Sequence, residues 1–132
     1  MTVKILVVDD ILEEVKDIIE KLRELGYNVM FTQNGDSTVK LLKKEHFSAV
    51  ILDFLFPGLT GKEIILLIKH DKGLKEIPVF FFVGHNSVPS KLKKEFNLLG
   101  AEGVWEKPRE TQKLIMEIKK IVPLKGEKHD KC

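Results

Sequence analysis

Five short apolar segments alternate along this chain with five segments of helical periodicity, and this alternation limits the folds that the chain can adopt. The apolar segments are rich in β-branched and aromatic residues, as strands buried on both faces are. They cover residues 3–8, 27–32, 48–52, 77–83 and 103–106. Strands that alternate with helices usually form a parallel sheet covered by helices on both sides. The pattern therefore predicts an α/β fold with a parallel sheet between two helical layers.

The segments between the predicted strands have apolar residues at the three- and four-residue spacing of amphipathic helices. The first of these segments runs from residue 11 to 25, and Gly26 is placed to end it. Thr60 and Glu63 form a capping-box pattern at the start of the third helix. The spacing also predicts helices after Asn34 and around residues 92–99 and 114–122. Each predicted strand is thus followed by a helix.

Length and composition fit one globular domain. The chain has 132 residues, of which 43% are hydrophobic and 32% charged, and a domain of this size buries about two-thirds of its unfolded surface. We expect the domain to cover residues 1–122 and residues 123–132 to form a charged, frayed C-terminal tail. The net charge of +2 is too small to indicate a nucleic-acid partner, and the sequence has no DNA-binding motif.

The sequence also argues against a membrane or secreted protein. The first residues lack the pattern of a signal peptide, and the apolar runs are far shorter than the ~20 residues of a membrane span. The single cysteine, Cys132, has no second cysteine for an internal disulfide and no metal-ligand companion. We therefore expect a cytoplasmic protein.

Four charged residues follow predicted strands at the points where the strands end. Asp9 and Asp10 follow the first strand, Asp53 the third and Lys107 the fifth. In open α/β sheets, ligands bind at the carboxyl ends of the strands, so we expect these side chains to converge. Two like charges about 4 Å apart repel by about 4 kcal/mol at an effective dielectric of about 20. A cluster of carboxylate oxygens therefore favours a bound cation, Mg²⁺ first and Mn²⁺ as its substitute.

Each of these residues also has a structural explanation. Asp9 could be an ordinary polar residue after a strand. Asp10 could cap the first helix, because Glu13 stands at the capping-box position. Asp53 could form a turn before Pro57, and Lys107 could be a solvated surface lysine. The shared site is the better hypothesis because the residues all fall at the same predicted edge.

The ordered set of motifs resembles the receiver domains of two-component response regulators, from Val3 to about Val122. The motifs are Asp9-Asp10, Asp53, Pro57-Gly58 with Gly61, Gly100-Ala101 and Lys107-Pro108. The resemblance implies a flavodoxin-like, three-layer (βα)5 fold with strand order 2-1-3-4-5. It also implies that Asp53 is the phosphoacceptor and that Lys107 binds a phosphoryl oxygen. Asp9, Asp10, Asp53 and the backbone carbonyl of Leu55 would hold the metal ion.

The resemblance further implies a donor and a place in phosphorelay signalling. The phosphoryl group would come from a phosphohistidine on a sensor histidine kinase or a histidine phosphotransfer protein, and an unidentified downstream protein would receive the signal. Such a domain catalyses its own aspartyl phosphorylation and dephosphorylation but is not a conventional enzyme. The resemblance also predicts a cis Lys107–Pro108 bond.

Several positions depart from the family's pattern. Val83 stands where the family has Ser or Thr, Gly84 where it has Ala, and Val104 where it has an aromatic residue. Trp105 comes one residue later, and one step along a strand reverses the direction of the side chain. Hence the alternative hypothesis is a receiver-like interaction module whose phospho-switching is weakened or absent.

Two further residues and one other family were considered. His85 could donate to a phosphoryl group in a pH-dependent way, although an exposed loop histidine is the better explanation. Arg109 is better explained as a surface arginine. A haloacid-dehalogenase-like phosphatase is disfavoured because those enzymes carry an Asp-x-Asp pattern after the first strand, whereas this chain has Asp9-Asp10.

Overall fold

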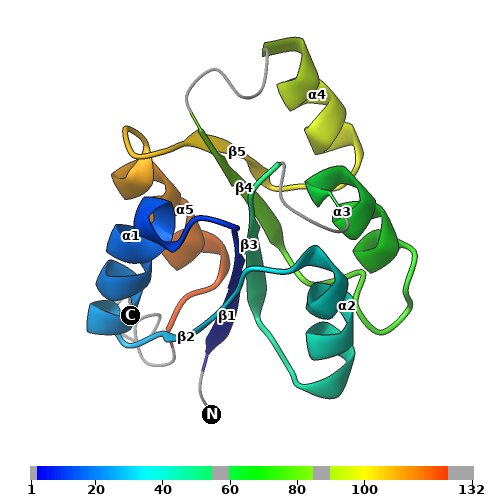
Figure 1. Ribbon diagram of the computed structural model, residues 1–132, viewed down its shortest axis with the longest axis horizontal. Coiled ribbons are helices and arrows are strands. Elements are labelled where there is room, and N and C mark those ends of the chain that lie inside the picture. The colour runs from blue at the N-terminus through cyan, green and yellow to red at the C-terminus, as the bar shows by residue number, and fades with distance from the viewer. Residues whose placement is uncertain (1–2, 55–59, 85–89, 125–132) are drawn as a thin grey trace, which may run out of the picture.

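The computed structural model describes residues 3–54, 60–84 and 90–124, except for the side chains of residues 90–92, and over these residues five strands alternate with five helices (Figure 1). In chain order the elements are β1 (Lys4–Val8), α1 (Leu12–Leu25), β2 (Asn28–Thr32), α2 (Gly35–Lys44), β3 (Ala49–Leu52), α3 (Gly61–Lys69), β4 (Val79–Val83), α4 (Ser90–Leu98), β5 (Gly103–Glu106) and α5 (Thr111–Ile121). The predicted α/β alternation is confirmed.

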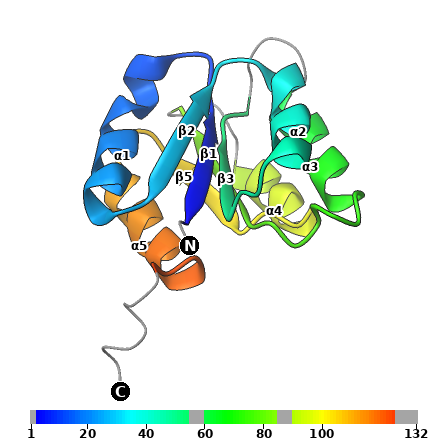
Figure 2. The same ribbon diagram turned by 90° about the horizontal axis from the view of Figure 1, so that it is seen from below.

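The strands form one parallel sheet in the order β2-β1-β3-β4-β5, as the resemblance implied. Helices α1 and α5 cover one face of the sheet, and α2, α3 and α4 cover the other (Figure 2). The register pairs Val8 of β1 with Leu52 of β3, so the residues that follow these two strands leave the sheet side by side. Val83 of β4 pairs with Glu106 of β5, which brings Lys107 to the same edge.

The sheet separates two hydrophobic cores, because alternate residues of each strand point to opposite faces. In β1, Ile5 and Val7 face the core beneath α1 and α5, whereas Leu6 and Val8 face the core beneath α2, α3 and α4. The buried stripe of α1 is shorter than its apolar periodicity suggested: Val15, Ile18, Ile19 and Leu22 are buried, whereas Ile11, Leu12 and Leu25 are about two-fifths exposed.

Local signals fix the ends of several helices. Gly26 ends α1 with φ of 113°, a backbone conformation that glycine adopts without strain. The Thr60–Glu63 capping box at the start of α3 has both of its reciprocal hydrogen bonds. By contrast, Asp10 does not cap α1: the residue at the cap is Ile11, and no side chain caps that end. This structural explanation of Asp10 is therefore wrong.

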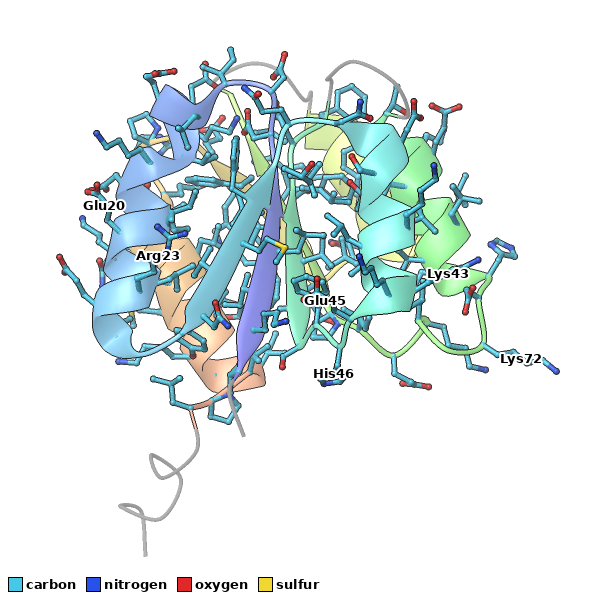
Figure 3. The ribbon with its side chains drawn as sticks, turned by 60° about the horizontal axis from the view of Figure 1, so that its bottom comes forward. Glu20, Arg23, Lys43, Glu45, His46 and Lys72 are labelled. Carbon is cyan, nitrogen blue, oxygen red and sulfur yellow. The ribbon has the colours of Figure 1, made fainter. Side chains whose placement is uncertain are left out.

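Polar contacts tie the helices to the sheet away from the carboxyl ends of the strands. Arg23 of α1 donates to the carbonyl oxygen of Val29 in β2 over 2.8 Å, and Lys4 of β1 donates to Glu45 after α2 over 2.6 Å. Figure 3 places Arg23 beside β2 and Glu45 near the end of α2. None of the described helices is both long and apolar enough to cross a membrane.

Candidate functional site

The sheet hydrogen bonding continues one residue beyond β1 and β3 and places two aspartates next to each other. The backbone N–H of Asp53 donates to the carbonyl of Val8 over 3.0 Å, and that of Asp9 donates to the carbonyl of Thr32 over 3.2 Å. Asp9 is buried, with 1% of its surface exposed, and the Asp53 side chain is 13% exposed. Both carboxylates are therefore held by backbone that the sheet fixes.

Asp10 completes an acidic cluster with these two residues. One carboxylate oxygen from each of Asp9, Asp10 and Asp53 lies within 4.8 Å of the others. Among the described residues this is the one group of His, Cys, Asp and Glu side chains close enough to share a metal ion. Since hard divalent cations prefer carboxylate oxygens, the donor set fits Mg²⁺, as the sequence predicted.

Lys107 reaches the acidic cluster from the end of β5. Its backbone N–H donates to the carbonyl of Val83 over 2.7 Å, and its bond to Pro108 is cis, as predicted. The ammonium is buried and lies 2.5 Å from Asp9 Oδ2, 3.0 Å from Glu14 Oε1 and 3.5 Å from Asp53 Oδ2. Lys107 is therefore not a solvated surface lysine, because three carboxylates surround its charge.

Backbone donors orient the two buried carboxylates. The N–H of Phe54 donates to Asp53 Oδ1 over 2.8 Å, and the N–H of Ile11 donates to Asp9 Oδ1 over 2.9 Å. The Oδ2 atoms of both residues face Lys107. One oxygen of each acid is thus fixed by the backbone, while the other lies on the side of the lysine.

Burial dominates the electrostatics of the site. It raises the pKa of Asp53 from 3.8 to about 6, against the lowering effect of the Lys107 charge, and the nearby charge of Asp9 adds to the rise. Burial also raises the pKa of Asp9, although its hydrogen bond from Lys107 opposes this. For Lys107, burial alone would lower the pKa, but the hydrogen bond to Asp9 and the charge of Asp53 outweigh it and raise the pKa. A divalent cation would relieve the crowding of the acids.

Gly61 allows α3 to begin directly against the site. A Cβ at this position would lie 2.3 Å from the carbonyl oxygen of Asp53 and 2.9 Å from the ring of Phe81. Real Cβ atoms do not approach other atoms so closely, so any larger residue would displace either α3 or the backbone of Asp53. The presence of glycine at position 61, which is part of the family motif, therefore has a steric explanation.

Three of the unusual residues at the ends of β4 and β5 contribute to packing, and the fourth lines a surface cavity. Val83 is buried, and Val104 packs against the core beneath α2, α3 and α4. Trp105 points to the opposite core, where its ring lies 5.8 Å from that of Phe80. Gly84, half-buried, lies beside Lys107 in the lining of one surface cavity. Trp105 therefore does not take the place of the aromatic residue that Val104 replaces.

Several predicted residues lie elsewhere or outside the described part of the chain. Arg109 is exposed and pairs with Glu106, as expected for a surface arginine. Leu55, Pro57-Gly58 and His85, together with the end of the tail, lie outside the described residues.

Two contacts at the site were not predicted from the sequence. Glu14 reaches Lys107 from a position 93 residues away, and no local motif indicates this pairing. Phe54, next to Asp53, contacts Phe96 of α4 at a ring distance of 5.2 Å, and Phe96 stacks on Phe81 at 4.4 Å. These rings come from positions far apart in the sequence, and no local pattern indicates that they meet.

The strand order and the placement of three acids and a lysine at one edge agree with one family model. The model of the response regulator receiver domain matches residues 5–119. The chain belongs to this family. The match is to receiver domains as such and does not favour the alternative of a receiver-like interaction module with weakened or absent phospho-switching.

The chain is also similar to individual proteins. The chain is 27% identical over 122 residues to the "Probable transcriptional regulator ycf29" of Pyropia yezoensis; the match covers 92% of this chain and 54% of that protein, so the chain spans about half of its length. Among solved structures it is similar to the chemotaxis response regulator CheY4 of Vibrio cholerae, with a TM-score of 0.80 and 24% identity over 92% of this chain and 100% of that chain.

A second similar structure contains a metal ion. It is the receiver domain of the sensor histidine kinase PA1611 from Pseudomonas aeruginosa PAO1, with a TM-score of 0.78 and 20% identity over 92% of this chain and 98% of that one. In that structure a magnesium ion is coordinated in the active-site cleft. At identities below 25%, both structural matches establish the fold of this receiver domain alone.

Proposed function

We propose that this receiver domain accepts a phosphoryl group on Asp53 from a phosphohistidine, with Mg²⁺ held by Asp9, Asp10 and Asp53. One observation carries the proposal: three carboxylates and a buried ammonium converge where β1, β3 and β5 end. Receiver domains bind Mg²⁺ at an acidic site, and the PA1611 receiver domain has a magnesium ion in its cleft. Mn²⁺ would substitute because it accepts the same oxygen ligands.

The chemistry requires little beyond positioning and charge. An oxygen of the Asp53 carboxylate attacks the phosphorus of the donor, forming an oxygen–phosphorus bond while the bond from phosphorus to the imidazole nitrogen breaks. The imidazole nitrogen keeps the electron pair of the broken bond. A divalent ion held by Asp9, Asp10 and Asp53 would neutralise charge on the phosphoryl oxygens. Lys107, already 3.5 Å from Asp53 Oδ2, supplies a point charge for one of those oxygens.

The partners follow from this chemistry. The donor is a sensor histidine kinase or a histidine phosphotransfer protein, and the output is a downstream protein of unidentified type. We expect such a relay to operate in the cytoplasm. Residues 1–122 would be the signalling unit, and residues 123–132 would be a tail. The net charge of +2 gives no reason to invoke direct contact with nucleic acid.

A phosphorylation assay read by intact mass tests the proposal. The wild-type protein, incubated with Mg²⁺ and either acetyl phosphate or a phosphorylated histidine phosphotransfer protein, should gain one phosphoryl group. Asp53→Asn should gain none, and omission of Mg²⁺ should suppress the gain. Asp17→Asn serves as the control, because Asp17 is an exposed partner of Lys21 on α1 and its variant should react like the wild type. A wild-type protein that gains no mass with either donor would refute the proposal.

A further inference from the structure

Glu14 is the carboxylate at this site that the proposed chemistry does not use. Its Oε1 lies 3.0 Å from Lys107 Nζ, closer than Asp53 Oδ2 at 3.5 Å. Within the described part of the chain, Glu14 is not a member of the acidic cluster that could share a metal ion. Its direct link to the site is therefore its hydrogen bond from Lys107.

The lysine does not contact its three acidic neighbours equally. An ammonium has three N–H donors, and Lys107 makes hydrogen bonds to Asp9 and Glu14, while Asp53 lies at the longest distance of the three acids. A phosphoryl oxygen on Asp53 would require the ammonium to turn toward Asp53. Asp9 already has a role as a proposed ligand of the ion. Glu14, by contrast, has no role in the proposed chemistry other than its contact with Lys107.

We propose that Glu14 is a positioning residue that holds the Lys107 ammonium away from Asp53 and must release it when Asp53 carries a phosphoryl group. The inference rests on the proposed function and deepens it, because it names a residue that sets how firmly the phosphoryl group is held. Competition by Glu14 for Lys107 destabilises the phosphorylated state relative to the unphosphorylated one.

The surroundings of Glu14 allow such a release. Its side chain is 44% exposed, whereas that of Lys107 is 4% exposed. Both residues line a surface cavity of about 310 Å³, together with Glu13, Asp17, Gly84 and Thr111. Water can therefore solvate the Glu14 carboxylate once the ammonium leaves it. The lysine, by contrast, stays buried and must find its new partner within the site.

Beryllofluoride, a phosphoryl mimic that binds a carboxylate, measures this competition without turnover. We expect Glu14→Gln to bind it more tightly than the wild type in the presence of Mg²⁺. A half-exposed ion pair contributes little compared with a buried one, so the expected gain in affinity is about twofold to fivefold. Fluorine NMR or calorimetric titration at a fixed magnesium concentration gives the dissociation constants.

Three further variants separate positioning from net charge. Glu13→Gln removes the same charge from the same turn of α1, where Glu13 is exposed, and it should change the affinity less than twofold, in line with weak, screened surface charges. Glu14→Asp keeps the charge but shortens the side chain, so it should behave like Glu14→Gln. In a Lys107→Met background, Glu14→Gln should have no effect beyond that of Glu13→Gln.

The outcomes distinguish this inference from the proposed function. Wild-type protein that binds beryllofluoride while Glu14→Gln and Glu13→Gln show equal affinities overturns the inference alone. The same holds if the Glu14→Gln effect persists without the Lys107 ammonium. Wild-type protein that neither binds beryllofluoride nor gains a phosphoryl group overturns the proposed function and this inference with it.

Discussion

Asp53 is buried beside another acid, and the metal-free fold must tolerate its charge. Its pKa in the folded chain is raised from 3.8 to about 6, mainly by burial. A raised carboxyl pKa means that the folded state binds the proton more tightly than the unfolded state. Its contribution to the free energy of unfolding is fully present below about pH 4 and is lost as the pH rises through about 6.

Asp53→Asn should therefore stabilise the metal-free protein at neutral pH, because the amide cannot ionise. A shift of about two pKa units corresponds to about 2–3 kcal/mol. Urea unfolding in the presence of a chelator, at pH values between 4 and 8, measures the difference, which should shrink toward pH 4. Asp17→Asn, which changes an exposed charge on α1, should alter the free energy of unfolding by less than about 0.5 kcal/mol. A destabilised Asp53→Asn variant at pH 7 would contradict the raised pKa.

At the level of elements, Phe96 is the fully buried side chain among those described in α4, and it packs this helix against the sheet. Phe96 is fully buried and stacks on Phe81 of β4 while contacting Phe54. Phe96→Ala should lower the free energy of unfolding by about 3–5 kcal/mol, the usual cost of a phenylalanine-sized cavity. The control on the same helix is Leu98→Ala: Leu98 is 88% exposed, and its loss should cost less than about 0.5 kcal/mol. Chemical unfolding of both variants tests whether α4 depends on this contact.

The start of α3 gives a second test at this scale, because α3 approaches β3 without room for a side chain. Gly61→Ala would push a Cβ against the carbonyl of Asp53, and we expect a loss of stability of roughly 1–3 kcal/mol together with weaker Mg²⁺ binding. Gly73→Ala is the matched control, since its nearest neighbour would be a side-chain oxygen of Asp71 at 3.4 Å. Equal effects of the two substitutions on Mg²⁺ affinity would show that Gly61 does not act through Asp53.

The sequence predicted the helices and strands better than the contacts between individual side chains. Strand runs, the ending of α1 by Gly26 and the Thr60 capping box depend on neighbouring residues, and all three are confirmed. The convergence of Asp9, Asp53 and Lys107 was also predictable, because parallel strands end at one edge of the sheet. The pairing of Glu14 with Lys107 was not predictable, since it depends on the rotation of α1 over the sheet and on side-chain conformations that no local pattern specifies.

At the scale of the whole molecule, the site lies where the carboxyl ends of β1, β3 and β5 meet at one edge of the sheet. Asp9 and Asp10 follow β1, Asp53 follows β3, and Lys107 follows β5, so a divalent ion bound by the acids would link the ends of two neighbouring strands. An ion that binds only the folded chain stabilises it by mass action. Metal binding and folding should therefore be coupled across the entire domain.

Magnesium should consequently cancel most of the stability difference that removal of the Asp53 charge creates. At a magnesium concentration about 100 times its dissociation constant, the wild type should gain about 2.7 kcal/mol, which offsets the cost of the buried Asp53 charge. Asp53→Asn, which lacks one charged ligand, should gain much less. Because the pKa of Asp53 is about 6, protons compete with the ion near pH 5, and the gain should be smaller there than at pH 8.

Urea unfolding with and without Mg²⁺, at constant ionic strength set with NaCl, separates ion binding from screening. An equal gain in both proteins would mean that the ion does not bind at Asp53, whereas a gain confined to the wild type would tie the stability of the whole domain to this one carboxylate.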